Sequence, residues 1–332
     1  MIRSNLSADR RMSRSGLSAA TLVAGLVTPL LFSASASALD FSNLIVFGDS
    51  IVDTGNTQAA VVGAGFPDPA PAGAGYFGGR FTNGINPADV LNNEIEGTNA
   101  VGSIFGGDNY SFGGARARDD GDFLPDVVNQ VISYTTTLGG GGIDPNALIM
   151  INVGGNDVRD IVINGLTGAA RQGIIDDAVT AISSAVSFLQ LAGAQNILFT
   201  GVGDVGGIPE ILALGGTAPV DGRQASEDMN AAIQAALPGD VTFFDTISFF
   251  DQVQANPAAF GLPVGINLTD ACVGTADAPT CTNYAFFDTV HPTTQLLQVL
   301  GAELVTVVPE PGTGLLMMLG LAGLASGRRQ QA

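Results

Sequence analysis

The stretch YAFFDTVHPTTQ, residues 284–295, contains His291, the only histidine of the 332-residue chain. Asp288 precedes it by three positions, and a tight turn can direct two side chains at that spacing toward the same place. Pro292, directly after the histidine, restricts His291 to extended backbone conformations. A carboxylate that orients an imidazole suits general-base catalysis, so this pair could activate a nucleophile supplied elsewhere in the chain.

Three other segments supply the remaining groups that acyl transfer requires. GDSIVDTGN places Ser50 just after a short apolar run, NYSFGGA places two glycines (113 and 114) after another, and GGND places Asn156 after a third. Acyl transfer needs a nucleophile, hydrogen-bond donors for the oxyanion and an oriented base. The sequence therefore predicts that these groups converge with the Asp/His pair.

Each of these residues also has a purely structural interpretation. Ser50 could cap a short helix, Asn156 could cap the helix after its strand, and the glycines could form only a tight turn. Asp288 could be a loop acid in a chain rich in acids, and we interpret Asp49 and Asp157, beside the predicted site, as structural. Because four such coincidences would have to hold together, the catalytic interpretation is favoured.

Positioning these residues requires a parallel sheet. Short apolar runs closed by Gly, Asp or Thr are typical of buried parallel strands, and helical patterns lie between them, as at residues 171–192. The alternation predicts a three-layer α/β domain with a central sheet of about five strands, whose carboxyl ends form the ligand-binding edge. The expected strands are 43–48, 147–154, 195–200, 240–245 and, as a fifth candidate, 109–114.

Two segments are expected to form loops around this edge. Residues 58–80 are so rich in Gly, Ala and Pro that we expect a long, mobile loop. Residues 262–283 contain Cys272 and Cys281, nine positions apart. Two cysteines at this spacing are expected to form a disulfide in an exported protein. A metal site would need more ligands than this loop supplies.

Both ends of the chain indicate sorting. Residues 1–38 run from arginines through an apolar stretch to an A-x-A site, the order of a secretory signal peptide. A VPEP motif at 308–311 is followed by a short apolar stretch and two arginines. Residues 309–332 therefore resemble the PEP-CTERM signal of Gram-negative bacteria. That resemblance implies processing by an exosortase, transient membrane association, and delivery to the cell surface or beyond; a plain tail anchor is the alternative. Residues 39–308 are expected to form one domain.

The charge of that domain excludes one class of partner. The chain contains no lysine, and residues 39–308 carry six arginines against 29 acidic residues, a formal charge of about −23. Such a surface repels phosphate backbones, so nucleic-acid binding is not expected. Strongly anionic substrates are disfavoured for the same reason, although salt weakens this preference.

Other motifs point to rival functions but fail in context. GVGDVG at 201–206 fits the dinucleotide pattern G-x-G-x-x-G, yet Pro209 interrupts the helix that it should open, and Asp221 does not close a second strand. A P-loop would need a lysine, and Val52 stands where the G-x-S-x-G elbow needs a glycine. RDDGD at 118–122 could hold calcium, but a solvated loop is the favoured interpretation.

Taken together, the motifs indicate a family. GDSIVDTGN, GRFTNG (79–84), NYSFGGA, GGND and DTVH occur in one order, and over residues 41–305 the chain resembles SGNH, or GDSL-type, serine hydrolases. Ile51 replaces the usual leucine beside the serine. The resemblance implies a flavodoxin-like α/β/α fold and hydrolysis of carboxylic esters, as by an esterase or lipase, with no metal or organic cofactor.

The resemblance also implies a role for each residue. Ser50 would be the nucleophile, His291 the base, and Asp288 the residue that orients the imidazole. The backbone N–H groups of Ser50 and Gly114 and the side chain of Asn156 would bind the oxyanion. Members of the family act on small esters, lipids, phospholipids and acetylated polysaccharides, and the sequence does not select among them. A non-enzymatic surface or matrix protein on a degenerate hydrolase fold is the rival hypothesis.

Overall fold

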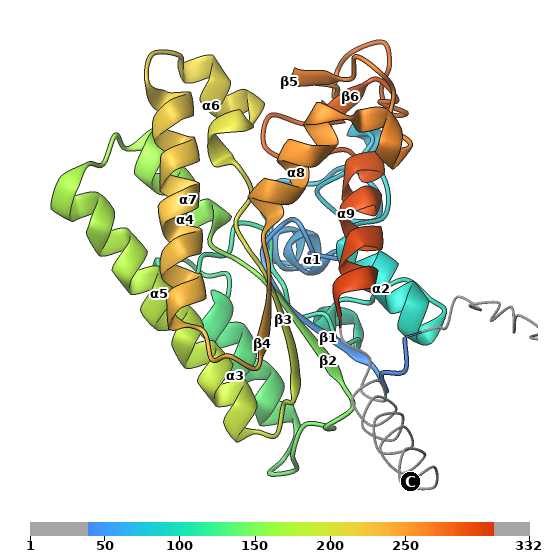
Figure 1. Ribbon diagram of the computed structural model, residues 1–332. Coiled ribbons are helices and arrows are strands. Elements are labelled where there is room, and N and C mark those ends of the chain that lie inside the picture. The colour runs from blue at the N-terminus through green and yellow to red at the C-terminus, as the bar shows by residue number, and fades with distance from the viewer. Residues whose placement is uncertain (1–38, 309–332) are drawn as a thin grey trace, which may run out of the picture. The chain divides into compact units, whose positions relative to one another are not determined.

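A computed structural model describes residues 39–308, so the predicted signal peptide (1–38) and sorting tail (309–332) lie outside the described residues. Its centre is a parallel sheet in the order β1-β2-β3-β4 (Figure 1). The four strands form where the apolar runs predicted them. Their bounds are Leu44–Gly48 (β1), Leu148–Asn152 (β2), Asn196–Thr200 (β3) and Val241–Phe244 (β4).

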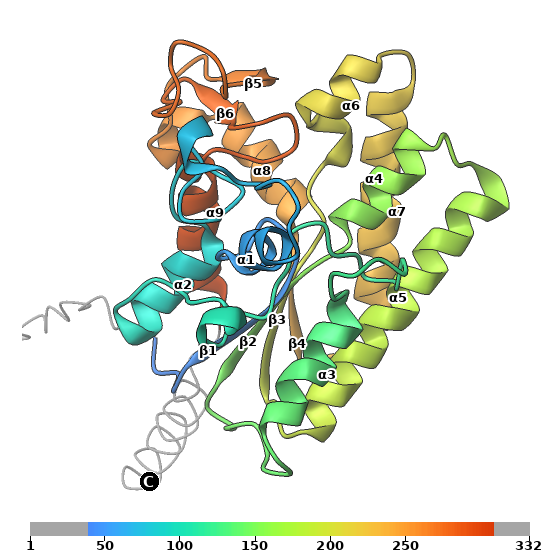
Figure 2. The ribbon, with the colours of Figure 1, turned by 180° about the vertical axis from the view of Figure 1, so that it is seen from behind.

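Helices cover both faces of this sheet, which confirms the predicted three-layer α/β/α architecture (Figures 1 and 2). Alternate side chains of each strand enter different cores. In β1, Ile45 and Phe47 join the core under α3, α5 and α7, whereas Leu44 and Val46 join the core under α2, α8 and α9. The helix bounds are Val127–Thr137 (α3), Gly168–Leu191 (α5), Ala218–Ala236 (α7), Pro87–Glu96 (α2), Thr246–Ala255 (α8) and Thr294–Val307 (α9).

The candidate fifth strand does not form, so within residues 39–308 the main sheet has four strands where about five were expected. Residues 109–114 run beside β1, and the Tyr110 N–H donates to the Val46 carbonyl at 2.7 Å, but only an isolated bridge results. The next rung would join the Gly48 N–H to the Tyr110 carbonyl. Instead this N–H donates to Oε1 of Gln130 at 2.8 Å. With the segment counted, the order matches the 2-1-3-4-5 pattern of flavodoxin-like sheets.

The two expected loops contain more structure than predicted. Residues 58–80 include most of α1 (Asn56–Gly63) and the 3₁₀ turn η1 (Ala72–Ala74). Within residues 262–283 lies β5 (Asn267–Ala271), which pairs in parallel with β6 (Tyr284–Phe286) above the carboxyl ends of the main sheet (Figure 1). The predicted disulfide between Cys272 and Cys281 is present in this region.

Candidate active site

Ser50 lies two residues beyond β1, on a turn that depends on Gly48. A Cβ at position 48 would lie 2.2 Å from the Asn152 carbonyl oxygen, so only glycine allows β1 and β2 to approach this closely at their carboxyl ends. Gln130, from α3, fixes the turn further, because its Nε2 donates to the Gly48 carbonyl at 2.9 Å while its Oε1 accepts the Gly48 N–H. The serine is thereby held at the ligand-binding edge of the sheet.

The turn between β6 and α9 brings the histidine to this serine. Nε2 of His291 lies 2.8 Å from the Ser50 hydroxyl oxygen, and Nδ1 lies 2.7 Å from Oδ2 of Asp288. The backbone N–H groups of Val290 and His291 donate to Oδ1 of Asp288 at 2.8 and 2.7 Å, which fixes the carboxylate within the turn. The three predicted side chains therefore meet, although 241 positions separate serine from histidine.

The electrostatics of the turn determine which nitrogen carries the proton. Burial raises the pKa of Asp288, but the adjacent His291 and the hydrogen bonds that Asp288 accepts outweigh it and hold the pKa below its ordinary value. An ionised carboxylate only accepts hydrogen bonds, so Nδ1 donates to it and Nε2 keeps its lone pair. Nε2 can then accept the proton of the Ser50 hydroxyl, as nucleophilic activation requires.

The predicted oxyanion donors include two backbone N–H groups, those of Ser50 and Gly114. Within residues 39–308, the N–H groups of Ser50 and Gly114 donate to no acceptor. The Gly113 N–H is already engaged, since it donates to Oδ2 of Asp53 at 2.9 Å. The structure therefore distinguishes the two glycines, and Gly114 has the available donor.

Asn156, the remaining predicted donor, lies at the start of α4 (Gly155–Ile163) and does not cap this helix, whose N-cap is Gly154. Its Nδ2 donates to the Ala115 carbonyl at 2.9 Å, which ties α4 to the loop that carries Gly114. The amide has a second N–H, and Asn156 lines the pocket that contains Ser50. Asn156 therefore shares a pocket with Ser50 and is bonded to the residue that follows Gly114.

Two buried carboxylates fix these segments by accepting hydrogen bonds from backbone N–H groups. Asp157, fully buried, accepts the Ala117 N–H at 2.8 Å, and burial raises its pKa to about 6. Asp49 accepts the Ile51 N–H at 3.0 Å and fixes the serine turn. Burial raises the pKa of Asp49 to about 7, against the lowering effects of that hydrogen bond and of His291. Both acids hold backbone, in agreement with their structural interpretation.

An apolar pocket of about 170 Å³ opens beside Ser50. It extends from the ends of the strands between α8, α9 and the segment that contains β5. Asn156, Arg159 and Asp204 lie among its few polar groups, and the rest of its wall is mainly aliphatic. Its apolar lining includes Phe250, Val253, Leu262, Leu268, Leu297 and Leu300.

The motifs that suggested other ligands have local roles. Within residues 39–308 no group of three or more His, Cys, Asp or Glu side chains is arranged to hold a metal ion. In segment 118–122, Asp120 pairs with Arg116, and Asp122 accepts the Leu124 N–H at 2.7 Å. Segment 201–206 leads from β3 into a 3₁₀ turn and the short helix α6 (Pro209–Leu214), and part of it lines the apolar pocket.

Sequence reasoning missed three residues that support the site: Asp53, Gln130 and Tyr76. Asp53 lies in the GDSIVDTGN motif, three positions after the serine, and its polar character in a buried turn was an available signal. The Tyr76 hydroxyl donates to Oδ2 of Asp288 at 2.9 Å. No periodicity or motif marks Tyr76, which lies in the Gly- and Pro-rich stretch, 212 positions before its partner.

Comparison with known proteins finds two family models that match the chain. The model of the GDSL-like lipase/acylhydrolase family matches residues 44–304, and that of the PEP-CTERM protein-sorting motif matches residues 307–330. Esterase EstA of Pseudomonas aeruginosa is 29% identical over 85% of the chain, and the chain spans about half (48%) of its length.

A phosphatidylcholine-sterol acyltransferase of Aeromonas hydrophila is also 29% identical, over 70% of the chain and 66% of that protein. Among solved structures, an acetylxylan esterase from Geobacillus stearothermophilus aligns over 81% of this chain and 95% of its own, with a TM-score of 0.42 and 16% identity.

Proposed function

Because the chain belongs to the family of GDSL-like lipases and acylhydrolases, we propose that it hydrolyses carboxylic esters through a covalent acyl intermediate on Ser50. The observation that carries this proposal is the continuous contact from the Ser50 hydroxyl through His291 to Asp288. A serine hydroxyl is a poor nucleophile in water, and a base within hydrogen-bond reach removes its proton as it attacks.

In this mechanism Ser50 attacks the ester carbonyl while Nε2 of His291 takes its proton, and the adjacent Asp288 carboxylate stabilises the imidazolium. The developing oxyanion is bound by the backbone N–H groups of Ser50 and Gly114 and by the Asn156 amide. The imidazolium then protonates the leaving alkoxide. A water molecule, deprotonated by the same imidazole, hydrolyses the acyl-serine and restores the enzyme.

Hydrolysis of p-nitrophenyl esters by the purified protein, with Ser50→Ala as the matched control, tests the proposal. We expect the unsubstituted protein to release p-nitrophenol and the variant to lose nearly all of this activity. Equal rates in the two proteins would refute a serine esterase and favour a non-enzymatic surface protein.

We further propose that the apolar pocket binds the acyl chain of the ester. Its aliphatic wall begins beside Ser50, where an acyl group would be attached. Each buried methylene contributes about 0.8 kcal/mol, so kcat/KM should rise roughly two- to fourfold per added methylene until the pocket is filled. Acetyl esters are then expected to be poorer substrates than hexanoyl or octanoyl esters.

A paired substitution in the same segment tests the pocket assignment. Leu268→Trp would narrow the pocket, whereas Val264→Trp adds the same ring at a site that is 85% exposed and outside the lining. We expect Leu268→Trp to lower kcat/KM for octanoyl esters much more than for acetyl esters, and Val264→Trp to change neither. Equal losses for both chain lengths would place the acyl chain elsewhere.

We propose export for this chain, with the PEP-CTERM motif directing its sorting to the cell surface. In this scheme signal peptidase removes residues 1–38, residues 39–308 form the hydrolase domain, and an exosortase processes residues 309–332 after transient association with the membrane. Its substrates would then be esters encountered at or outside the surface of a Gram-negative cell.

A further inference from the structure

Tyr76 completes the set of donors around the Asp288 carboxylate. Oδ1 accepts the backbone N–H groups of Val290 and His291, and Oδ2 faces both Nδ1 of His291 and the Tyr76 hydroxyl, at 2.7 and 2.9 Å. The three other donors come from the same turn as the carboxylate. Tyr76 alone comes from a distant segment, so its hydrogen bond fixes the turn relative to the rest of the domain.

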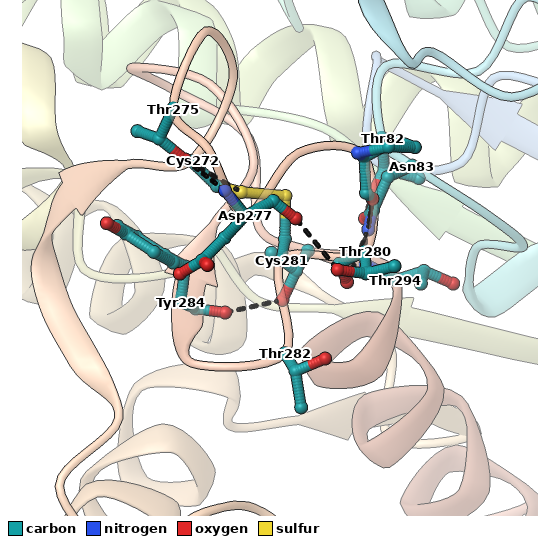
Figure 3. The surroundings of a disulfide bond; sticks show 12 residues. Thr82, Asn83, Cys272, Thr275, Asp277, Thr280, Cys281, Thr282, Tyr284 and Thr294 are labelled. Carbon is teal, nitrogen blue, oxygen red and sulfur yellow. Dashed lines mark hydrogen bonds between the residues drawn. A yellow bond between two sulfur atoms is a disulfide. The ribbon is translucent and has the colours of Figure 1, made fainter.

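The disulfide region holds the Tyr76 ring in place. The ring packs edge-on against Phe287, with centroids 4.8 Å apart, and Phe287 is fully buried against the Cys272–Cys281 disulfide. Asn83, shortly after Tyr76 in the chain, donates to the carbonyls of Pro279 and Thr280 within the disulfide loop (Figure 3). The tyrosine therefore has little freedom to turn away from Asp288.

The Tyr76 hydroxyl acts only as a donor here. Burial, followed by the charge of Asp288 and the hydrogen bond to it, raises the pKa of Tyr76 well above its ordinary value. The phenol therefore stays protonated throughout the pH range in which an esterase would be assayed. A neutral donor at Oδ2 draws part of the carboxylate charge away from the imidazole, and a charge-assisted bond of this kind is stronger than a neutral one.

We propose that Tyr76 is a positioning residue for the Asp288–His291 pair. Its hydroxyl orients the Asp288 carboxylate toward Nδ1 of His291 and draws part of the carboxylate charge away from the imidazole. This role rests on the proposed esterase function. It predicts that removal of the phenolic hydroxyl lowers kcat without weakening substrate binding, because Tyr76 does not line the apolar pocket beside Ser50.

The pH dependence must be judged against the other groups near the pair. From the end of β1, Ser50 contacts the imidazole, and Asp49 lies close enough for the charge of His291 to oppose the rise that burial causes in the pKa of Asp49. From α6, Glu210 donates its backbone N–H to the Thr289 carbonyl, while its carboxylate is paired with Arg159. The Phe81 ring, 5.2 Å from the imidazole, is uncharged. All of these remain when Tyr76 alone is changed.

Tyr76→Phe, with Tyr284→Phe as the matched control, tests the proposal. Tyr284 packs against the same disulfide cluster, but within residues 39–308 its hydroxyl has no hydrogen-bond partner. For Tyr76→Phe we expect kcat to fall about tenfold with KM unchanged. The acidic limb of the kcat/KM profile should move to higher pH, because the fully charged carboxylate favours the imidazolium. Tyr284→Phe should leave both quantities unchanged.

Two results would overturn this role. One is an unchanged kcat and pH profile in Tyr76→Phe; the other is an equal loss in both variants without movement of the acidic limb, which would indicate packing alone. Inactivity of the unsubstituted protein would instead refute the esterase function on which the role depends. The comparison of Tyr76→Phe with active parent protein therefore separates failure of this inference from failure of the function.

Discussion

His291→Ala is expected to lower kcat for ester hydrolysis by a factor on the order of 10⁴ to 10⁶, nearly as much as Ser50→Ala. The reason is that Nε2 of His291 lies 2.8 Å from the Ser50 hydroxyl, and the sequence contains no second histidine that could replace it. Without this base the hydroxyl must lose its proton to water. Steady-state rates with a p-nitrophenyl ester, measured at several pH values, give the comparison.

The double variant Ser50→Ala/His291→Ala provides the control for this prediction. Residues that act as one unit have strongly non-additive effects, so the double variant should be no slower than either single variant. If His291→Ala retains more than about a tenth of the parent rate, the imidazole is not the base. Removal of a triad member leaves a residual activity far below that threshold.

Asn156→Ala is expected to lower kcat about 10²- to 10³-fold while KM changes little, because an oxyanion donor acts mainly in the transition state. Its amide also donates to the Ala115 carbonyl and thereby holds the loop that carries Gly114. Both effects of the substitution reduce stabilisation of the oxyanion. Separate determination of kcat and KM with one ester distinguishes this result from a loss of substrate affinity.

Asn164→Ala is the matched control on the same helix. Asn164 follows the last residue of α4, and its side chain donates to the Asp160 carbonyl at 2.8 Å. Asn164 does not line the pocket that contains Ser50. It should lose a comparable side-chain-to-backbone bond without loss of kcat. If Asn156→Ala and Asn164→Ala behave alike, Asn156 contributes to helix structure and not to the oxyanion site.

The central residues were accessible from sequence because each is tied to a recognisable local pattern. Ser50 and Asn156 each follow a short apolar run, and parallel strands bring their carboxyl ends to one edge. Asp288 and His291 are joined by a short turn, so their contact is local. The four main strands and the two apolar cores follow from the same alternation of short apolar runs and helical patterns.

Contacts made by side chains across long sequence distances were not accessible in this way. The expected fifth strand does not form, because Gln130, on a helix, accepts the N–H of Gly48 that the next rung of the ladder would use. Likewise, Tyr76 reaches Asp288 only because its loop packs on the disulfide region. Neither interaction leaves a periodic pattern, so hydrophobic periodicity could not predict them.

The central claim, that Ser50 forms a covalent acyl intermediate, is tested most directly by labelling with a p-nitrophenyl alkylphosphonate followed by peptide mass spectrometry. This reagent phosphonylates an activated serine and releases p-nitrophenol. The account predicts one adduct per chain, located on Ser50, that appears in step with the loss of activity and forms far more slowly in His291→Ala. Inactivation with Ser50 unmodified, or an adduct on another residue, would contradict it.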